Sequence, residues 1–279
     1  MTVFKHLFKE LFKQKKRNAN AVVIIQFVAA LAILIITMGN LIINKDFSSE
    51  DWRDIEPLSY ILFGLFSFVA LPIYLIVTCV KNERFNRSQT WRLAPVNDEM
   101  FYLDNILSSF ASVVYLMVAQ FLITAALVGI GSLLFKDVFN DTIKTFVNMF
   151  KAGSGLHFNI VIGNALQIIC FIILFSLFTY LIISFLNFAT RSIMDYLPGM
   201  SSKTGVFIVQ VVLIILIMRL LTTLFKIFGR LITSPMGYLL GSASTGLGKA
   251  ILLYLVLDIA LLLINMFLIS KFFEAAPNK

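Results

Sequence analysis

Long apolar runs separated by shorter polar connections dominate this 279-residue chain. A helix that crosses the roughly 30 Å hydrocarbon core of a bilayer needs about 20 apolar residues, and six runs meet this requirement. We expect a transmembrane helix over each run. The runs cover residues Ala21–Ile43, Pro57–Val80, Ile106–Phe135, Phe158–Phe188, Val206–Leu224 and Ile251–Phe272. The pattern therefore predicts an all-α polytopic membrane protein with six transmembrane helices, in which residues 1–279 form a single transmembrane domain with both termini on one side.

Residues 1–18 carry a different pattern, in which apolar positions recur every three or four residues opposite a row of lysines. The apolar positions are Phe4, Leu7, Phe8, Leu11 and Phe12, and the lysines are Lys5, Lys9, Lys13 and Lys16. This spacing is typical of an amphipathic helix that lies in the membrane surface, with its basic face toward anionic lipid headgroups. We therefore predict an interfacial helix that leads into the first transmembrane helix.

Composition and charge exclude a soluble globular domain, because 59% of the residues are hydrophobic and only 14% are charged, against about 25% charged in soluble domains. In a chain this apolar, the net charge of +8 sets the orientation in the membrane and does not indicate a nucleic-acid partner. The segment before the first run holds six Lys and Arg residues, the first connection holds two, and the second holds four. Because Lys and Arg favour the cytoplasmic side, both termini and the second connection are predicted to be cytoplasmic.

The segment 225–249 fits neither a full transmembrane helix nor an ordinary polar loop. It mixes apolar patches with one proline and five glycines, which are Gly229, Pro235, Gly237, Gly241, Gly246 and Gly248. Glycine and proline interrupt helices, and irregular backbone at membrane depth is tolerated where protein satisfies it. The segment is therefore either a re-entrant external element or a plain amphipathic loop.

The chain lacks the residue patterns of common catalytic sites. His6 and His157 are its two histidines and lie far apart along the sequence, so no histidine metal cluster is expected. The stretch 243–250 is similar to a phosphate-binding loop, but it begins with alanine and has alanine, not serine or threonine, after Lys249. We therefore expect no enzyme, no catalytic residue, and no metal or cofactor site in this chain.

Two charged residues stand inside predicted transmembrane helices, Arg219 in the fifth and Asp258 in the sixth. A charge at the bilayer centre costs roughly 2.5 to 3.5 kcal/mol on insertion scales. At 1.5 Å per residue, Arg219 lies about 20 Å from the cytoplasmic side and Asp258 about 10 Å from the external side, so their depths coincide. We predict an ion pair or shared polar network that either locks the two helices together or lies in a transport path.

Other polar residues follow stripes along the predicted transmembrane helices. Polar stripes hold helices together or line a translocation route, and the sequence leaves both readings open. The candidates for such a lining are Gln26, Gln120, Gln210, Tyr254 and Asn265.

The second connection, residues 81–105, is the most distinctive polar segment. Pro95 is expected to break the chain, and Asn97 or Asp98 to cap a new helix. Just before Pro95, an aromatic, a cationic and an aliphatic residue stand together as Trp91, Arg92 and Leu93. Such a patch suits the docking of a soluble partner.

This segment resembles the permease subunits of type-2 ABC transporters of the exporter-like kind. Members commonly show a Glu, then a Thr-led stretch that ends in Leu-x-x-Pro-(Val/Ile)-(Ser/Asn), then a run that climbs into the third helix. The matching residues here are Glu83, Thr90, Leu93, Pro95, Val96 and Asn97, followed by Phe101 to Leu107. The sequence departs from the pattern at Trp91, where an acidic residue is common.

The resemblance implies that residues 81–105 form a coupling helix that docks into a separate ATPase subunit, which binds ATP and Mg²⁺. The coupling residues would be Glu83, Thr90, Trp91, Arg92, Leu93, Pro95, Val96 and Phe101. It also implies a second permease, either another copy or a related chain, and export of an amphiphile such as a hydrophobic peptide, drug or lipid across a bacterial cell membrane. The alternatives are an ion-coupled secondary transporter or flippase, with Asp258 as the coupling residue, and a non-transporting immunity or sensor subunit.

Overall fold

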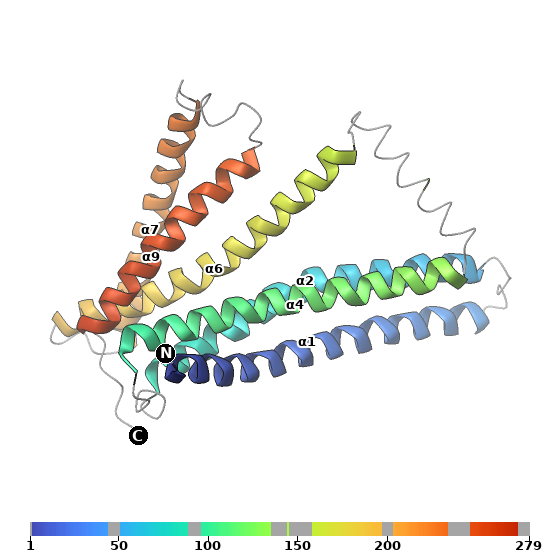
Figure 1. Ribbon diagram of the computed structural model, residues 1–279, viewed down its shortest axis with the longest axis horizontal. Coiled ribbons are helices and arrows are strands. Elements are labelled where there is room, and N and C mark those ends of the chain that lie inside the picture. Colours follow the sequence, from blue (N-terminus) through green and yellow to red (C-terminus); the bar gives the residue numbers. More distant parts are fainter. Residues whose placement is uncertain are drawn as a thin grey trace. The chain divides into compact units, whose positions relative to one another are not determined.

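The computed structural model describes residues 2–43, 51–88, 96–134, 144, 158–196, 203–233 and 246–272. Within these residues the protein is helical and contains no strand. The helices are α1 (Thr2–Ile43), α2 (Asp51–Arg87), α4 (Asp98–Leu134), α6 (Phe158–Tyr196), α7 (Lys203–Thr233) and α9 (Gly246–Phe272), shown in Figure 1. Six of the described helices are long and apolar enough to cross a membrane, as the hydropathy pattern predicted.

Most of these helices are longer than one bilayer crossing requires. The longest, α1, has 42 residues, which is about 63 Å at 1.5 Å per residue. In α1 the predicted interfacial segment and the first predicted transmembrane helix form one continuous helix. The first residues of the predicted re-entrant segment, 225–233, belong to α7, and its last residues, 246–249, belong to α9. Residues 234–245 lie outside the described residues.

The predicted start of α4 is confirmed. The helix begins at Asp98, directly after Asn97, and the backbone N–H of Phe101 donates to the carbonyl oxygen of Asn97 at 2.9 Å. Asp98 and Glu99 occupy the first turn, where negative side chains interact favourably with the positive end of the helix dipole. Local chemistry therefore fixes where α4 begins.

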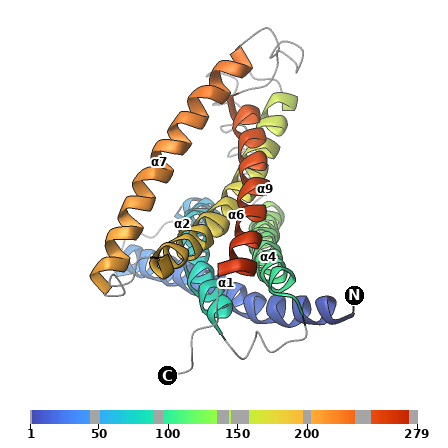
Figure 2. The ribbon, with the colours of Figure 1, turned by 90° about the vertical axis from the view of Figure 1, so that its left-hand side faces the viewer.

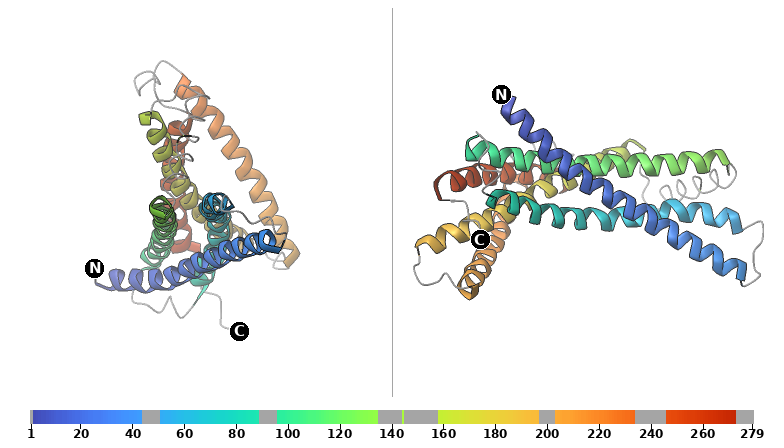
Figure 3. Two further views of the ribbon diagram at one scale, coloured as in Figure 1. Left: turned by 90° about the vertical axis from the view of Figure 1, so that its right-hand side faces the viewer. Right: turned by 90° about the horizontal axis from the view of Figure 1, so that it is seen from below.

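The chain forms two compact units that alternate along the sequence. The first unit comprises Met1–Leu11, Thr78–Phe110 and Gly163–Lys279, and the second comprises Phe12–Val77 and Ala111–Ile162. In the first unit, α7 contacts α9 (Figure 2). In the second unit, segments of α1, α2 and α4 lie side by side (Figures 1 and 3), joined by side-chain hydrogen bonds between them.

Candidate functional site

Polar side chains of α2 and α4 form a buried network in the first unit, next to the connection between these helices. The Asn105 side-chain amide donates to Asn86 Oδ1 at 2.8 Å and to the Asn82 carbonyl oxygen at 3.2 Å. Ser109 Oγ donates to Asn82 Oδ1 at 2.8 Å. All four side chains are buried, so these bonds form away from water, where an unpaired polar group is costly. The network holds the two helices in register as they approach the connection.

Glu83 joins this part of α2 to α6. Its Oε1 accepts a hydrogen bond from Ser184 Oγ at 2.8 Å, and its side chain is buried. The cationic side chains of Arg87 and Arg191 lie close enough to interact electrostatically with the carboxyl group. A buried carboxylate is tolerated when hydrogen bonds and opposite charges accompany it. Glu83 is therefore a structural contact between α2 and α6.

Asn265 of α9 connects three helices of the same unit. Its side-chain amide donates to the Tyr102 hydroxyl and to the Leu181 carbonyl oxygen, both at 2.9 Å. The Tyr102 ring meets Phe188 edge to face, with ring centroids 5.5 Å apart. Asn265, predicted as a lining residue, is fully buried and acts as a link between α9, α4 and α6.

The start of α1 packs on the connection between α2 and α4. Leu7 and Leu11 are buried against Phe101, and Phe85 and Val96 pack against this cluster. The prediction assigned the whole apolar face of residues 1–18 to the membrane surface. In the structure two of its leucines contact protein, because Phe101 and Val96 offer an apolar surface that excludes water equally well.

The predicted coupling residues fall into two groups. Glu83, Val96 and Phe101 lie among the described residues. Glu83 is buried and accepts a hydrogen bond from Ser184, whereas Val96 and Phe101 pack in the apolar cluster with Leu7 and Leu11. The others lie outside the described residues, and they are Thr90, Trp91, Arg92, Leu93 and Pro95. The sequence analysis did not single out Asn82, Asn86 and Asn105 as site residues, although their spacing along the sequence offered a signal. Asn82 and Asn86 are four residues apart, as are Asn105 and Ser109, so each pair shares one helix face.

Two predicted lining residues meet in the second unit. The Gln120 side-chain amide donates to Gln26 Oε1 at 2.9 Å, and Gln26 in turn donates to the Phe63 carbonyl oxygen at 3.1 Å and to Ser67 Oγ at 2.5 Å. Gln26 and Gln120 are both buried. The pair links α1, α2 and α4, and a polar group inside a helical bundle commonly serves this purpose.

The same unit buries the backbone around Lys15. The Tyr74 hydroxyl lies 2.7 Å from Ser112 Oγ and 3.2 Å from the carbonyl oxygen of Lys15. Nearby, the Tyr115 hydroxyl donates to Asn20 Oδ1 at 2.9 Å, and the ammonium group of Lys16 lies 4.8 Å from the centroid of the Tyr115 ring. This geometry is a cation–π contact. Two lysines of the basic segment are therefore engaged by protein, because Lys15 is itself only 1% exposed and Lys16 contacts the Tyr115 ring.

The remaining lining candidates lie in the first unit. Gln210 is half-buried on α7, and Tyr254 is half-buried on α9. The Tyr254 ring contacts Phe171, Phe175 and Phe178 of α6 edge to face, at centroid distances of 5.4, 5.9 and 5.2 Å. Aromatic packing therefore holds α9 against α6 on this side of the helix.

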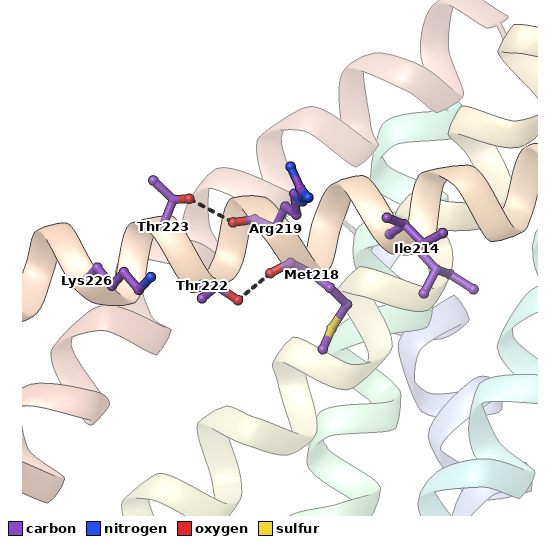
Figure 4. A pocket seen from close by; sticks show the side chains of 7 residues that line it. Ile214, Met218, Arg219, Thr222, Thr223 and Lys226 are labelled. Carbon is purple, nitrogen blue, oxygen red and sulfur yellow. Dashed lines mark hydrogen bonds between the residues drawn. The ribbon is translucent and has the colours of Figure 1, made fainter.

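The structure places the two residues of the predicted pair, Arg219 and Asp258, in different surroundings. Asp258 is only 3% exposed, and among the described residues neither of its carboxyl oxygens has a hydrogen-bond partner. Arg219 is exposed on α7 (Figure 4). The rise per residue predicts how far along its helix each residue lies, whereas the direction of its side chain around the helix axis depends on packing.

Comparison of the chain with protein-family models, with curated proteins and with solved structures gives no match. What the molecule itself shows is a helical chain with six helices long and apolar enough to cross a bilayer. These helices are consistent with a multi-pass membrane protein. Among the described residues, a buried polar network lies next to the connection between α2 and α4.

Proposed function

We propose that the chain is the membrane-spanning permease subunit of an ATP-driven exporter of the type-2 ABC kind. A separate ATPase subunit supplies ATP binding, Mg²⁺ and hydrolysis, and a second permease, either another copy or a related chain, completes the pathway. The substrate class is an amphiphile such as a hydrophobic peptide, drug or lipid. The membrane is the bacterial cell membrane, with both termini and residues 81–105 on the cytoplasmic side.

The observation that carries this proposal is the way the connection between α2 and α4 is anchored. Val96, at its end, packs on Leu7, Leu11 and Phe101, and the helices on either side are joined by hydrogen bonds from Asn105. Coupling between an ATPase and the membrane helices requires that the connection be held rigidly against those helices. A displacement of a loosely held loop would be absorbed by local motion. A partner that moves this connection also moves α1, α2 and α4.

The hydrogen bond between Glu83 and Ser184 connects this set of contacts to α6. Interiors are close-packed and transmit strain between elements. A displacement at residues 88–97 is thus passed to four helices, which suits a switch between inward-facing and outward-facing forms. The aromatic and aliphatic residues Trp91 and Leu93 provide the docking contact, since such residues dominate the binding energy of protein interfaces.

Co-purification tests the proposal. The full chain with an affinity tag is expressed from its native chromosome and extracted in mild detergent, and ATPase activity and accompanying chains are identified. We expect an ABC-type ATPase to accompany the wild type and to be lost from the double variant Trp91→Ala plus Leu93→Ala. The matched control, Ser88→Ala plus Gln89→Ala, changes the same connection without removing apolar surface and is expected to keep the ATPase. Recovery of the wild type without any ATPase would refute the proposal.

A second candidate function is ion-coupled transport, which is favoured by the buried carboxyl group of Asp258, since it has no hydrogen-bond partner among the described residues. An ionisable residue buried in a membrane helix is a common carrier of protons or cations. In proteoliposomes that contain this chain alone, an ion-coupled transporter moves its substrate when an ion gradient is imposed across the membrane. The variant Asp258→Asn is expected to abolish this movement. Movement that occurs only after an ATPase subunit and ATP are added to these proteoliposomes decides for the exporter.

A further inference from the structure

One face of α7 carries a hollow of about 440 Å³ with both apolar and basic walls (Figure 4). We call this the α7 face. It is formed by Ile214, Ile215, Met218, Arg219, Thr222, Thr223 and Lys226. Its three apolar members precede both of its cations along the helix. The hollow therefore has an apolar end and a cationic end.

The length of the α7 face along the helix matches the thickness of one bilayer leaflet. The candidate membrane span of α7 runs from Thr204 to Leu224 over 21 residues, which is about 31 Å, or one bilayer core. Ile214 lies at the middle of this span, so the part of the face from Ile214 to Leu224 covers about 15 Å, half of the core. Arg219 lies about 8 Å inside the boundary, and Lys226 lies just beyond it.

The two cations point to an anionic ligand. Arg219 and Lys226 are seven residues apart, so they share one side of the helix, and both are exposed. Between them, the hydroxyl groups of Thr222 and Thr223 donate to the carbonyl oxygens of Met218 and Arg219, at 2.7 and 2.9 Å. Their donors are therefore already used, and positive charge is the remaining attraction for a ligand.

The apolar half of the α7 face is exposed, and its burial against an apolar group would be favourable. Ile214 is 46% exposed, Ile215 is 55% exposed and Met218 is 61% exposed. A long Arg side chain at this depth is able to reach along the helix to the headgroup region while its aliphatic part stays in the apolar layer. A ligand that fits both halves has acyl chains next to the isoleucines and a negative headgroup between Arg219 and Lys226.

We propose that the α7 face binds an anionic phospholipid of the surrounding leaflet. Charge complementarity favours a phospholipid over a second copy of the chain, because the face has two cations within a single leaflet. The site sorts anionic from zwitterionic lipids and keeps an annular lipid beside α7. This inference does not depend on the transport function, and its test contains no ATPase and no transported substrate.

The experiment measures lipid retention by the full purified chain. Wild-type protein is reconstituted in vesicles of equal parts dioleoyl-phosphatidylglycerol and dioleoyl-phosphatidylcholine, extracted in detergent and analysed by native mass spectrometry. We expect retained phosphatidylglycerol to exceed phosphatidylcholine. Each surface cation changes the affinity for anionic lipid by about fivefold, so Arg219→Gln plus Lys226→Gln is expected to lower retention of phosphatidylglycerol by about thirtyfold.

Two variants serve as controls. Lys271→Gln removes one exposed cation from the last turn of α9, outside the α7 face, and is expected to leave retention unchanged. Arg219→Lys keeps the charge, so it is expected to retain lipid even if the neutral variants are poorly produced.

The following outcomes would overturn the proposal. Equal retention of the two lipids by the wild type would show that the face does not select for charge. Equal loss in Lys271→Gln and in the double variant would show a net-charge effect without a site. A change in oligomeric mass in the double variant, with lipid retention unchanged, would assign the face to a second copy of the chain.

Discussion

Asn265 offers a direct test of the buried polar contacts in the first unit, because its role there is that of a donor. Both N–H groups of its side-chain amide are used, one by the Tyr102 hydroxyl and one by the Leu181 carbonyl oxygen. Among the described residues its own Oδ1 has no hydrogen-bond partner. Substitution by aspartate keeps the shape but replaces the donating group with an oxygen that faces a carbonyl oxygen.

The magnitude follows from these contacts. Two interhelical hydrogen bonds in a membrane protein contribute about 1 kcal/mol together at the average value and about 3 kcal/mol at the largest values observed. A carboxylate at this depth adds roughly 2.5 to 3.5 kcal/mol, so we expect Asn265→Asp to lower the free energy of unfolding by at least about 3 kcal/mol. Asn265→Leu also loses both bonds but removes an unpaired acceptor, so we expect a loss of about 1 kcal/mol or less.

The assay is unfolding of the purified chain in mixed micelles with increasing dodecyl sulfate, followed by circular dichroism. The matched control is Asn20→Asp, since Asn20 is exposed and its Oδ1 accepts a hydrogen bond from Tyr115. Aspartate preserves that acceptor, so the control should change stability by less than about 0.5 kcal/mol. If Asn265→Asp were as stable as the wild type, or if Asn20→Asp lost as much, the assignment of Asn265 as a donor would fail.

Three further predictions concern other buried contacts. Leu11→Ala opens a cavity beside Phe101 and should cost about 2 to 5 kcal/mol, seen as faster tryptic cleavage near the start of α1, while the exposed Leu31→Ala should leave that rate unchanged. Gln120→Leu leaves the partner glutamine on α1 without its donor and should cost about 1 to 3 kcal/mol, and changing both glutamines to leucine should recover most of the loss in thermal unfolding. Asp258→Leu removes a buried carboxyl group that has no hydrogen-bond partner within the described helices and should raise the free energy of unfolding by about 1 to 3 kcal/mol; a lower stability would mean that the carboxyl group is engaged.

Most of the helical architecture was predictable, because a helix in a bilayer satisfies its own backbone hydrogen bonds and its position depends on local composition. The six apolar runs lie within the six described helices except for Phe135. The beginning of α4 was equally local, since Pro95 disfavours a helical conformation in the residue before it and Asp98 suits a first turn. Hydropathy did not reveal how far each helix continues beyond the apolar run, as in α1.

The candidate site was predictable only in part. The sequence selected Gln26, Gln120 and Asn265 as polar residues in apolar helices, and the structure shows each of them in a buried hydrogen bond. Which residue each one binds was not predictable, because the partners are 37 to 163 residues away along the chain. Asn105 was not predicted as a site residue because it lies at the edge of an apolar run, where polar residues are common at the membrane surface.

The sequence by itself determined which six segments are long and apolar enough to cross a membrane and where α4 begins, since both depend on neighbours a few positions apart. Only the tertiary structure decided the direction of each side chain around its helix. That direction left Asp258 buried without a hydrogen-bond partner among the described residues, and it left Arg219 exposed. It also placed Leu7 and Leu11 against Phe101. Burial of apolar surface is non-directional, so a sequence indicates that a face will be covered, whereas packing selects what covers it.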